Sequence, residues 1–346
     1  MSRKPVVLIT GASGEIGHVL IERLSSNADR AVVTLDLSPL AAELAPKVRQ
    51  HYVGSILDPQ LLDRILAEFE IDLIFHLAAV LSTRGEFAPV TAHKVNVEGT
   101  LAMLEFAQRQ GESHGRPVIF LDPSSIAVYG FPNLDAKQAA GKVKENEHNQ
   151  PLTMYGCNKL YGELLGSYYA GNYKQLSVDP VRPKVDFRAI RFPGLISAVT
   201  LPSGGTSDYA PEMIHAAAEG KPYACFVRPD ARIPFMAMPD AIDAMLKLAM
   251  APAERLGRRV YNIGAFSPSA DEIQRIVTAA FPDARITTAV DAKRQRIIDS
   301  WPEDVDDAPA CRDWGHHPLF NLESAFRDYL IPTIRKQYAP RPVVTS

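Results

Sequence analysis

Tyr155 and Lys159 could together move a proton to or from an alcohol. They stand four positions apart in a segment with helical spacing, and residues four apart on a helix share one face. A free tyrosine has a pKa of about 10 and is a poor base at neutral pH. A neighbouring ammonium favours the phenolate and lowers that pKa. The pair is therefore predicted to act as an acid/base group beside a cofactor.

A glycine-rich segment far upstream could bind that cofactor. Glycines recur at every third position directly after the apolar run Val6–Thr10, at the point where a helical segment begins. Such glycines let the backbone turn tightly and approach a pyrophosphate, which then rests on the helix N-terminus. A tight turn without a ligand is the alternative interpretation. The expected contacts of this loop are Gly11, Ser13, Gly14, Glu15, Ile16 and Gly17.

The ends of two further apolar runs extend the predicted cofactor site. Asp36 ends the second run, 19 residues after Gly17, where an acidic residue receives hydrogen bonds from the adenosine ribose. A carboxylate there would repel a 2′-phosphate, so NAD is favoured over NADP; an acidic strand end in solvent is the alternative. Leu77, Ala78 and Ala79 follow the fourth run. Small side chains there would let the cofactor lie close, although simple packing explains them equally well.

Alternating strands and helices must position these residues. The alternation predicts an α/β fold, a Rossmann-type doubly wound parallel sheet covered on both faces. The carboxyl ends of such strands form the active site. The expected strands are residues 6–10, 31–35, 51–53, 73–77, 118–121 and 186–191. The expected helices are residues 17–24, 60–69, 95–108, 152–169, 211–219 and 239–250.

The second half of the chain has a looser pattern, which predicts a smaller C-terminal substrate-binding lobe. The NAD-binding domain would cover residues 1–193, with residues 236–264 returning to it. The lobe would cover residues 194–235 and 265–346, including a loop at 203–208. Residues 133–150 are polar and rich in lysine, which predicts a surface insertion.

The composition excludes several classes of protein. A formal net charge of −3 gives no general attraction to nucleic acid or to an anionic membrane. No apolar run is long enough to span a membrane, and no cleavable signal is apparent. Three dispersed cysteines make no disulfide framework, and the histidines show no metal-ligand spacing, so no metal site is predicted. These cysteines fit a protein of a reducing compartment, and the cytoplasm is the expected location.

A serine at a strand end completes an ordered pattern. Ser125 stands five residues before Gly130, after the fifth predicted strand. A hydroxyl there can hold a substrate oxygen, although such a serine is more often a turn former. With the glycine loop, Asp36, Asn96 and the Tyr-x-x-x-Lys segment, all in this order, the chain resembles the extended branch of the short-chain dehydrogenase/reductase superfamily, the NAD-dependent epimerases and dehydratases.

This resemblance implies a role for each matching residue. Tyr155 would be the acid/base, Lys159 would lower its pKa and bind the nicotinamide ribose, and Ser125 would be the catalytic serine. Members commonly form homodimers through helices that match residues 96–109 and the helix of Tyr155. A departure is Ser55, where many relatives carry an acidic residue. The implied NAD contacts outside the glycine loop are Asp36, Ser55, Ile56, Leu77, Ala78, Ala79, Asn96, Tyr155, Lys159 and Pro193.

The second half resembles the short-chain-type L-threonine 3-dehydrogenases. This resemblance implies NAD-dependent oxidation of the C3 hydroxyl of L-threonine, or of a similar β-hydroxy acid, to the ketone. Ser82, Ser125, Thr206 and Trp301 would line the amino-acid pocket; a loop serine, a turn threonine and a core tryptophan are the ordinary alternatives. The matching segments are residues 81–86, 191–197, 204–210, 238–241, 300–302, 306–307 and 313–315.

Two other functions stay open. A nucleotide-sugar epimerase or dehydratase of the same branch would keep its NAD bound. Such enzymes usually carry an asparagine shortly after the sixth strand, and residues 192–196 contain none. A non-catalytic NAD-binding protein would often lack the tyrosine or the lysine of the pair, and both are present here. The expected partners are thus a small-molecule substrate and a second copy of the chain.

Overall fold

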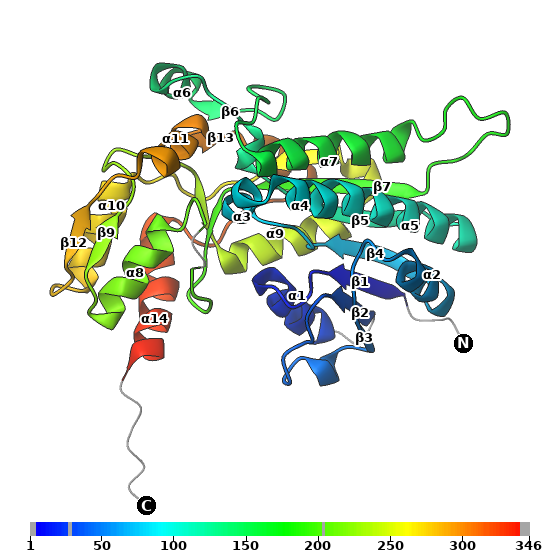
Figure 1. Ribbon diagram of the computed structural model, residues 1–346, viewed down its shortest axis with the longest axis horizontal. Helices are drawn as coiled ribbons and strands as arrows, with labels where there is room; N and C mark the ends of the chain where they lie inside the picture. Colours follow the sequence, from blue (N-terminus) through cyan, green and yellow to red (C-terminus); the bar gives the residue numbers. More distant parts are fainter. Residues whose placement is uncertain (1–4, 27–29, 203–204, 340–346) are drawn as a thin grey trace, which may run out of the picture.

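The computed structural model describes residues 5–26, 30–202 and 205–339 (Figure 1). Its centre is a seven-stranded sheet in the order β11-β7-β5-β4-β1-β2-β3, with every neighbouring pair parallel. This confirms the predicted Rossmann-type α/β fold and adds one strand, β11. The strands are β1 Val6–Thr10, β2 Ala31–Asp36, β3 Gln50–Val53, β4 Ile71–His76, β5 Val118–Ser125, β7 Val185–Phe192 and β11 Val260–Asn262.

The order of the strands creates the ligand crevice. The chain moves outward from β1 to β3 and then returns to place β4 on the other side of β1. Loops that leave β1 and β4 therefore diverge at the carboxyl edge of the sheet, and ligands of open parallel sheets bind at such a switch point. The glycine loop follows β1, and residues 77–79 follow β4.

Helices cover both faces of the sheet because its strands alternate their side chains. Val7 and Ile9 of β1 join the core under one set of helices, whereas Val6 and Leu8 join the core under the other. The first set is α1 Glu15–Ser25, α9 Met238–Met250 and α12 Ala308–Trp314. The second set is α2 Pro59–Glu68, α5 Gly99–His114 and α7 Met154–Gly171.

The helix predicted for residues 95–108 is divided in the structure. Residues Lys94–Glu98 form a π-helix, η2, between the short helix α4 (Pro89–His93) and α5. A π-turn is wide, is rarely predictable from side-chain spacing, and is frequent near functional sites. Here it contains Asn96, one of the predicted cofactor contacts.

A smaller C-terminal region lies beside the carboxyl edge of the sheet (Figure 1). Its core contains residues of α8 and α10 together with Trp301. The predicted domain boundary at residue 193 falls between β7 and β8, and Ser203 and Gly204 of the predicted loop lie outside the described residues. The main elements are β8 Gly194–Ile196, α8 Tyr209–Glu219, β9 Tyr223–Cys225, β10 Phe235–Ala237, α10 Ala270–Ala280, β12 Ile286–Thr288, α11 Ala292–Ser300, η5 Ala325–Leu330 and α14 Ile331–Tyr338.

The predicted surface insertion at residues 133–150 is anchored from within by Lys137. The Nζ of Lys137 donates to the backbone carbonyls of Arg232 and Ile298, at 2.8 and 3.0 Å. Burial lowers the pKa of this lysine to about 8. The prediction missed this because a lysine-rich composition does not show which ammonium finds buried carbonyl partners. The insertion forms α6 Leu134–Ala140 and β6 Lys142–Val143, which pairs with β13 Asp304–Val305.

Candidate active site

The turn after β1 forms a cradle that fits a pyrophosphate. Gly11 has a φ of +69°, and a Cβ at this position would lie 2.6 Å from the backbone nitrogen of Ala78. Only glycine tolerates both the left-handed backbone and this close approach. Gly14 is the N-cap of α1 and supplies no capping side chain, so the first N–H groups of the helix can bind an anion.

Asp36 is fixed against the glycine loop. Its Oδ2 accepts a hydrogen bond from the Ser13 N–H at 3.0 Å, and its Oδ1 accepts one from the Ser38 N–H at 2.9 Å. Each carboxylate oxygen keeps a second lone pair. The half-buried carboxylate can therefore still accept hydrogen bonds from ribose hydroxyls, as the sequence predicts.

The short helix α3 (Ser82–Phe87) connects the predicted substrate pocket to the helix of the tyrosine. Ser82 Oγ lies 3.3 Å from Thr206 Oγ1, so two predicted pocket residues are in contact. A Cβ at Gly85 would lie 3.9 Å from the Cβ of Tyr155. Glu86 accepts a hydrogen bond from the Met154 N–H, at 2.8 Å, where α7 begins. Segment 81–86 thus packs against the start of α7, where Tyr155 lies.

The start of α7 is pressed against the loop of the predicted catalytic serine. A Cβ at Gly156 would lie only 2.1 Å from the carbonyl oxygen of Ala127, which belongs to the 3-10 turn η3 (Ile126–Val128). This approach places Tyr155 and Ser125 on adjoining elements. Ser125 Oγ accepts from the Ala127 N–H at 3.1 Å and is half-buried, whereas Ser124 donates inward to Glu163. Ser125 is therefore the serine available to a ligand.

Lys159 lies beneath the ring of Tyr155 and is itself paired. Its Nζ is 6.0 Å from the centroid of that ring and 3.4 Å from Oδ1 of Asp122 in β5. Sequence reasoning missed Asp122, although an acidic residue directly after the apolar run 118–121 was a visible signal. The side chains of Asp122 and Lys159 are 2% and 9% exposed.

The electrostatics of the pair differ from the expectation. Burial raises the pKa of Tyr155; Lys159 acts in the opposite direction, and Asp122 adds to the rise. The expectation of a lowered phenol pKa is therefore wrong in net direction, because loss of solvent outweighs the ammonium. Burial alone would lower the pKa of Lys159, yet Asp122 and Tyr155 together raise it, so the lysine is cationic.

Two buried polar residues brace the ends of β1 and β4. Asn96 accepts from the Val80 N–H at 2.7 Å and donates to the Val80 carbonyl at 2.9 Å. The ring nitrogens of His76 lie 2.8 Å from Thr10 Oγ1 and 3.1 Å from Thr100 Oγ1. Burial, with a smaller effect of Lys159, lowers the pKa of His76 to about 3. The ring is therefore neutral and structural.

The remaining predicted residues divide between the two sides of the crevice. Trp301 is 5% exposed and belongs to the hydrophobic cluster against which Tyr155 packs. Ser55 and Ile56 follow β3; Ser55 Oγ accepts from the Leu57 N–H at 3.1 Å. Pro193 is buried between β7 and β8. The roles assigned to these residues stay predictions. Leu77, Ala78 and Ala79 are half-buried beyond β4.

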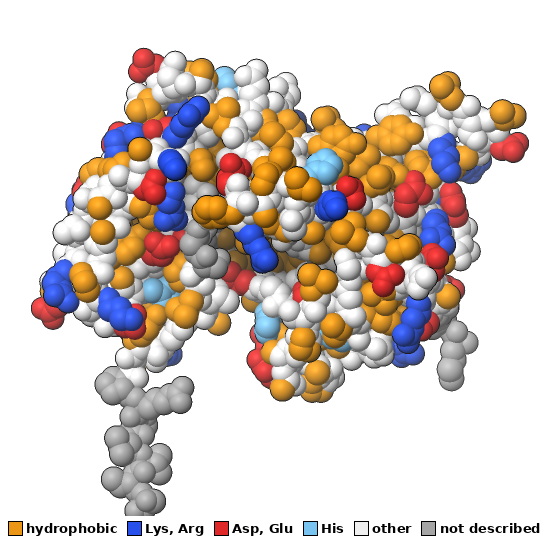
Figure 2. Space-filling view, in the orientation of Figure 1, with side chains coloured by type: hydrophobic (Ala, Val, Ile, Leu, Met, Phe, Trp, Pro, Cys, Tyr) orange, Lys and Arg blue, Asp and Glu red, His pale blue; other side chains and the backbone are white. Residues whose placement is uncertain are grey.

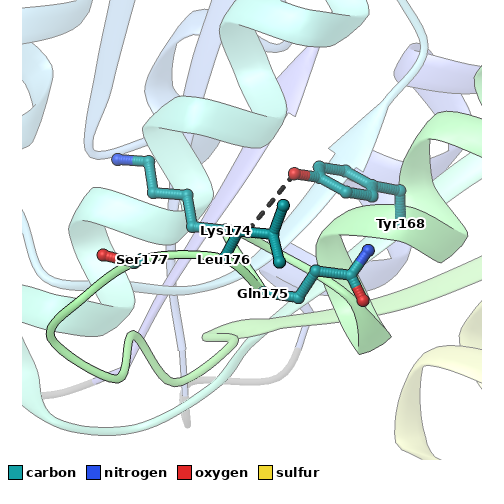
Figure 3. A pocket seen from close by; sticks show the side chains of 5 residues that line it. All are labelled: Tyr168, Lys174, Gln175, Leu176 and Ser177. Atoms are coloured by element: carbon teal, nitrogen blue, oxygen red, sulfur yellow. Dashed lines mark hydrogen bonds between the residues drawn. The ribbon is translucent and has the colours of Figure 1, made fainter.

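The surface is hollowed between α8 and α1, as Figure 2 shows. A separate pocket lies at the other end of α7, lined by Tyr168, Lys174, Gln175, Leu176 and Ser177 (Figure 3). Tyr168 is 13 residues beyond Tyr155, which is about 20 Å along a helix. This pocket is therefore not part of the candidate active site.

Within the described residues, no group of acidic, histidine or cysteine side chains could hold a metal ion, and no helix could cross a membrane.

Comparison with known proteins identifies relatives over nearly the full chain. The mitochondrial L-threonine 3-dehydrogenase of Bos taurus is 34% identical over 316 residues, which are 91% of this chain and 79% of the relative. The structure of L-threonine dehydrogenase from Clostridium difficile is 30% identical with a TM-score of 0.85, covering 98% of this chain and 100% of the other. A monomeric L-threonine 3-dehydrogenase of metagenomic origin is 34% identical with a TM-score of 0.82, covering 96% of this chain and 99% of the other.

The family assignment follows from the same comparison. Residues 7–264 match the model of the family described as "NAD dependent epimerase/dehydratase family". The matched range contains the glycine loop, Asp36, Ser125 and the pair of Tyr155 and Lys159. The resemblance predicted from these residues is thus confirmed, and the chain belongs to the NAD dependent epimerase/dehydratase family.

Proposed function

We propose that this protein is an NAD-dependent oxidoreductase that oxidises the C3 hydroxyl of L-threonine, or of a similar β-hydroxy acid, to the ketone. The observation that carries the proposal is the contact of Ser82 with Thr206. It brings two hydroxyls together at the short helix α3, whose Gly85 lies against Tyr155. The threonine dehydrogenases among the relatives support the choice of substrate.

The cofactor site fits NAD through groups that are already in place. The glycine cradle and the N-terminus of α1 would hold the pyrophosphate, and Asp36 would accept hydrogen bonds from the ribose hydroxyls. The charge of Asp36 favours NAD over NADP. The chemistry that NAD supplies when bound is acceptance of a hydride.

The residues of the chain would position the substrate and move its proton. The Ser125 hydroxyl would hold the substrate oxygen beside Tyr155. The Tyr155 phenolate would take the hydroxyl proton as the C3–H bond breaks, leaving a ketone, 2-amino-3-ketobutyrate, when threonine is the substrate. Lys159 favours the phenolate and opposes the effect of burial, which raises the pKa of Tyr155 overall. General-base catalysis of this kind contributes about a hundredfold to ten-thousandfold in rate.

A substrate panel with one matched pair of variants tests the proposal. NADH formation is measured with L-threonine, other β-hydroxy amino acids and UDP-sugars. L-threonine or a close analogue is expected to give turnover, and Tyr155→Phe to lower kcat at least about a hundredfold. Tyr161→Phe, which removes an exposed phenol from the same helix, is the control. Near-normal turnover of the Tyr155→Phe protein would refute the proposal.

The same panel tests the nucleotide-sugar alternative. An epimerase or dehydratase would convert the UDP-sugar with tightly retained cofactor and no net NADH. In the structure, β7 and β8 are joined by Pro193 alone, and the stretch 192–196 carries no asparagine for a diphosphate. This observation favours the amino acid as substrate. A protein that binds NAD but converts none of the panel would support the non-catalytic alternative.

We also propose that the protein is a homodimer formed through α5 and α7. Leu101 of α5 and Leu164 and Tyr168 of α7 are 41%, 65% and 39% exposed, and Figure 2 shows hydrophobic side chains over these helices. Apolar side chains grouped on a surface mark a site of association.

The cytoplasm is proposed as the compartment because Cys157, Cys225 and Cys311 are all free.

A further inference from the structure

A buried carboxylate that the proposed chemistry does not use lies below the Tyr155–Lys159 pair. Asp122 is the fifth residue of β5, and its Oδ1 is 3.4 Å from the Nζ of Lys159. Both side chains are almost fully buried. Solvent screens such a pair weakly, so the charge of the carboxylate also acts on groups near the lysine.

The other charged groups around this pair are already balanced. Glu163, one helical turn beyond Lys159, is joined to Arg191 of β7 by an ion pair of 2.6 Å. His76 of β4 is neutral, since its pKa is lowered to about 3. Burial raises the pKa of Asp122, and its ion-pair partner Lys159 opposes that rise by stabilising the carboxylate.

Charged groups on the remaining elements that pack against α7 or β5 are exposed or have other partners, and Glu86 accepts a hydrogen bond from the Met154 N–H. Glu86, His93, Lys94 and Glu98 are exposed to solvent. Glu105 of α5 accepts from the phenols of Tyr169 and Tyr173. Asp240 of α9 accepts from the N–H groups of Leu319 and Phe320. Asp122 is therefore the carboxylate that acts most directly on the acid/base pair among these groups.

We propose that Asp122 is a positioning residue for the acid/base pair: it holds the ammonium of Lys159 in place and sets the pH at which the Tyr155–Lys159 unit gives up a proton. The inference rests on the proposed function only for the role of Tyr155. With Asp122 ionised, loss of one proton leaves the three groups with a net negative charge. With a neutral residue at position 122, the same loss leaves them neutral and is easier, whichever partner releases the proton.

The first test is the pH profile of kcat/KM for NADH formation. Asp122→Asn is expected to move the acidic limb to lower pH by about one unit, as expected for a partly screened charge at this separation. Asp122→Glu keeps the charge and should leave the limb near its original position. Asp186→Asn is the matched control, because it removes a carboxylate that pairs with Arg188 near the start of β7.

The second test needs no substrate. The ultraviolet absorbance of the phenolate is titrated, and the curve of each protein is corrected by that of its Tyr155→Phe counterpart. The Tyr155 midpoint is expected to fall in Asp122→Asn and in a second neutral variant, Asp122→Ser. A midpoint that stays or rises in a folded neutral variant overturns the inference. Failure of threonine oxidation with a lowered midpoint would instead refute only the proposed function.

Discussion

Ser82 Oγ and Thr206 Oγ1 lie 3.3 Å apart although 124 positions separate the two residues in the chain. Ser82 begins α3, just beyond β4, whereas Thr206 precedes α8 of the C-terminal region. Their contact therefore joins the segment beyond the sheet edge to that region. Two adjacent hydroxyls can hydrogen-bond to the carboxylate or the hydroxyl of a β-hydroxy amino acid.

Removing either hydroxyl should weaken substrate binding more than catalysis. Ser82→Ala and Thr206→Val are each expected to raise KM for L-threonine by about tenfold or more, since a hydrogen bond to a charged group is worth about 1.5–3 kcal/mol. The loss of binding free energy in the double variant should be smaller than the sum of the two single losses, because the two residues share one hydrogen bond. Steady-state kinetics measure this, with Thr91→Ala on the exposed side of α4 as control. Fully additive losses would contradict a shared site.

Gly156 should not tolerate a methyl group. Its Cβ would collide with the Ala127 carbonyl at 2.1 Å, so Gly156→Ala must displace α7 from the loop of Ser125. Overpacking of this kind costs about 1–3 kcal/mol. We expect a lower melting temperature together with a loss of kcat.

A second glycine of α7 provides the control for that substitution. A Cβ at Gly162 would meet its nearest atom at 3.6 Å, an ordinary contact. Gly162→Ala should therefore keep or raise the melting temperature, because alanine favours a helix over glycine by about 1 kcal/mol. Equal melting temperatures of the two variants would show that the close approach of α7 to the Ala127 carbonyl does not determine the stability of the protein.

Asp36 should determine the choice between NAD and NADP. We expect NAD to bind at least about tenfold more tightly, since the juxtaposition of like charges is costly. Asp36→Asn should reduce this preference while keeping one acceptor for the N–H groups of Ser13 and Ser38. Fluorescence titrations with both dinucleotides measure the ratio, and equal affinities in the unsubstituted protein would contradict the assignment.

His76 should make the fold less stable as the solution is acidified. Its pKa is about 3 in the folded protein and 6.5 in its ordinary state, so the unfolded chain binds the proton first. The stability that the neutral ring contributes is present above pH 6.5 and is lost as the pH falls toward 3. Between about pH 7.5 and pH 5.5 the free energy of unfolding should fall by about 1–2 kcal/mol through this residue.

Urea unfolding at the two pH values measures that contribution. The His76→Gln protein should show a smaller loss of stability on acidification than the unsubstituted protein. His93→Gln, which replaces an exposed histidine, should retain the full loss. An unchanged pH dependence in His76→Gln would show that this buried ring does not govern it.

The proposed dimer should depend on the exposed apolar face of α5 and α7. Leu164→Glu places a charge on this face and is expected to convert a dimer into a monomer in analytical ultracentrifugation. Leu319→Glu changes an even more exposed leucine, at 78%, outside these helices and serves as control. A monomeric unsubstituted protein would refute the proposal, and one relative of 34% identity is itself described as monomeric.

The helices and strands of the fold could be predicted because each is determined mainly by residues that are neighbours in the sequence. Runs such as Val6–Thr10 form buried strands, and the glycine spacing after them requires a tight turn. The order of these elements then implied a parallel sheet with a crevice at its carboxyl edge. Residues of the candidate site, including Tyr155, Lys159, Ser125 and Asp36, were recognisable because each stands at a strand end or on one face of one helix.

The sequence by itself determined the fold class, the family pattern and the identity of the reactive side chains. Only the tertiary structure decided which groups meet: Ser82 with Thr206, and Lys159 with Asp122. It also decided that burial raises the pKa of Tyr155 against the effect of its lysine, and that Lys137 points inward. The physical reason is that desolvation and ion pairing depend on distances between distant segments, which are set by packing and not by spacing along one helix.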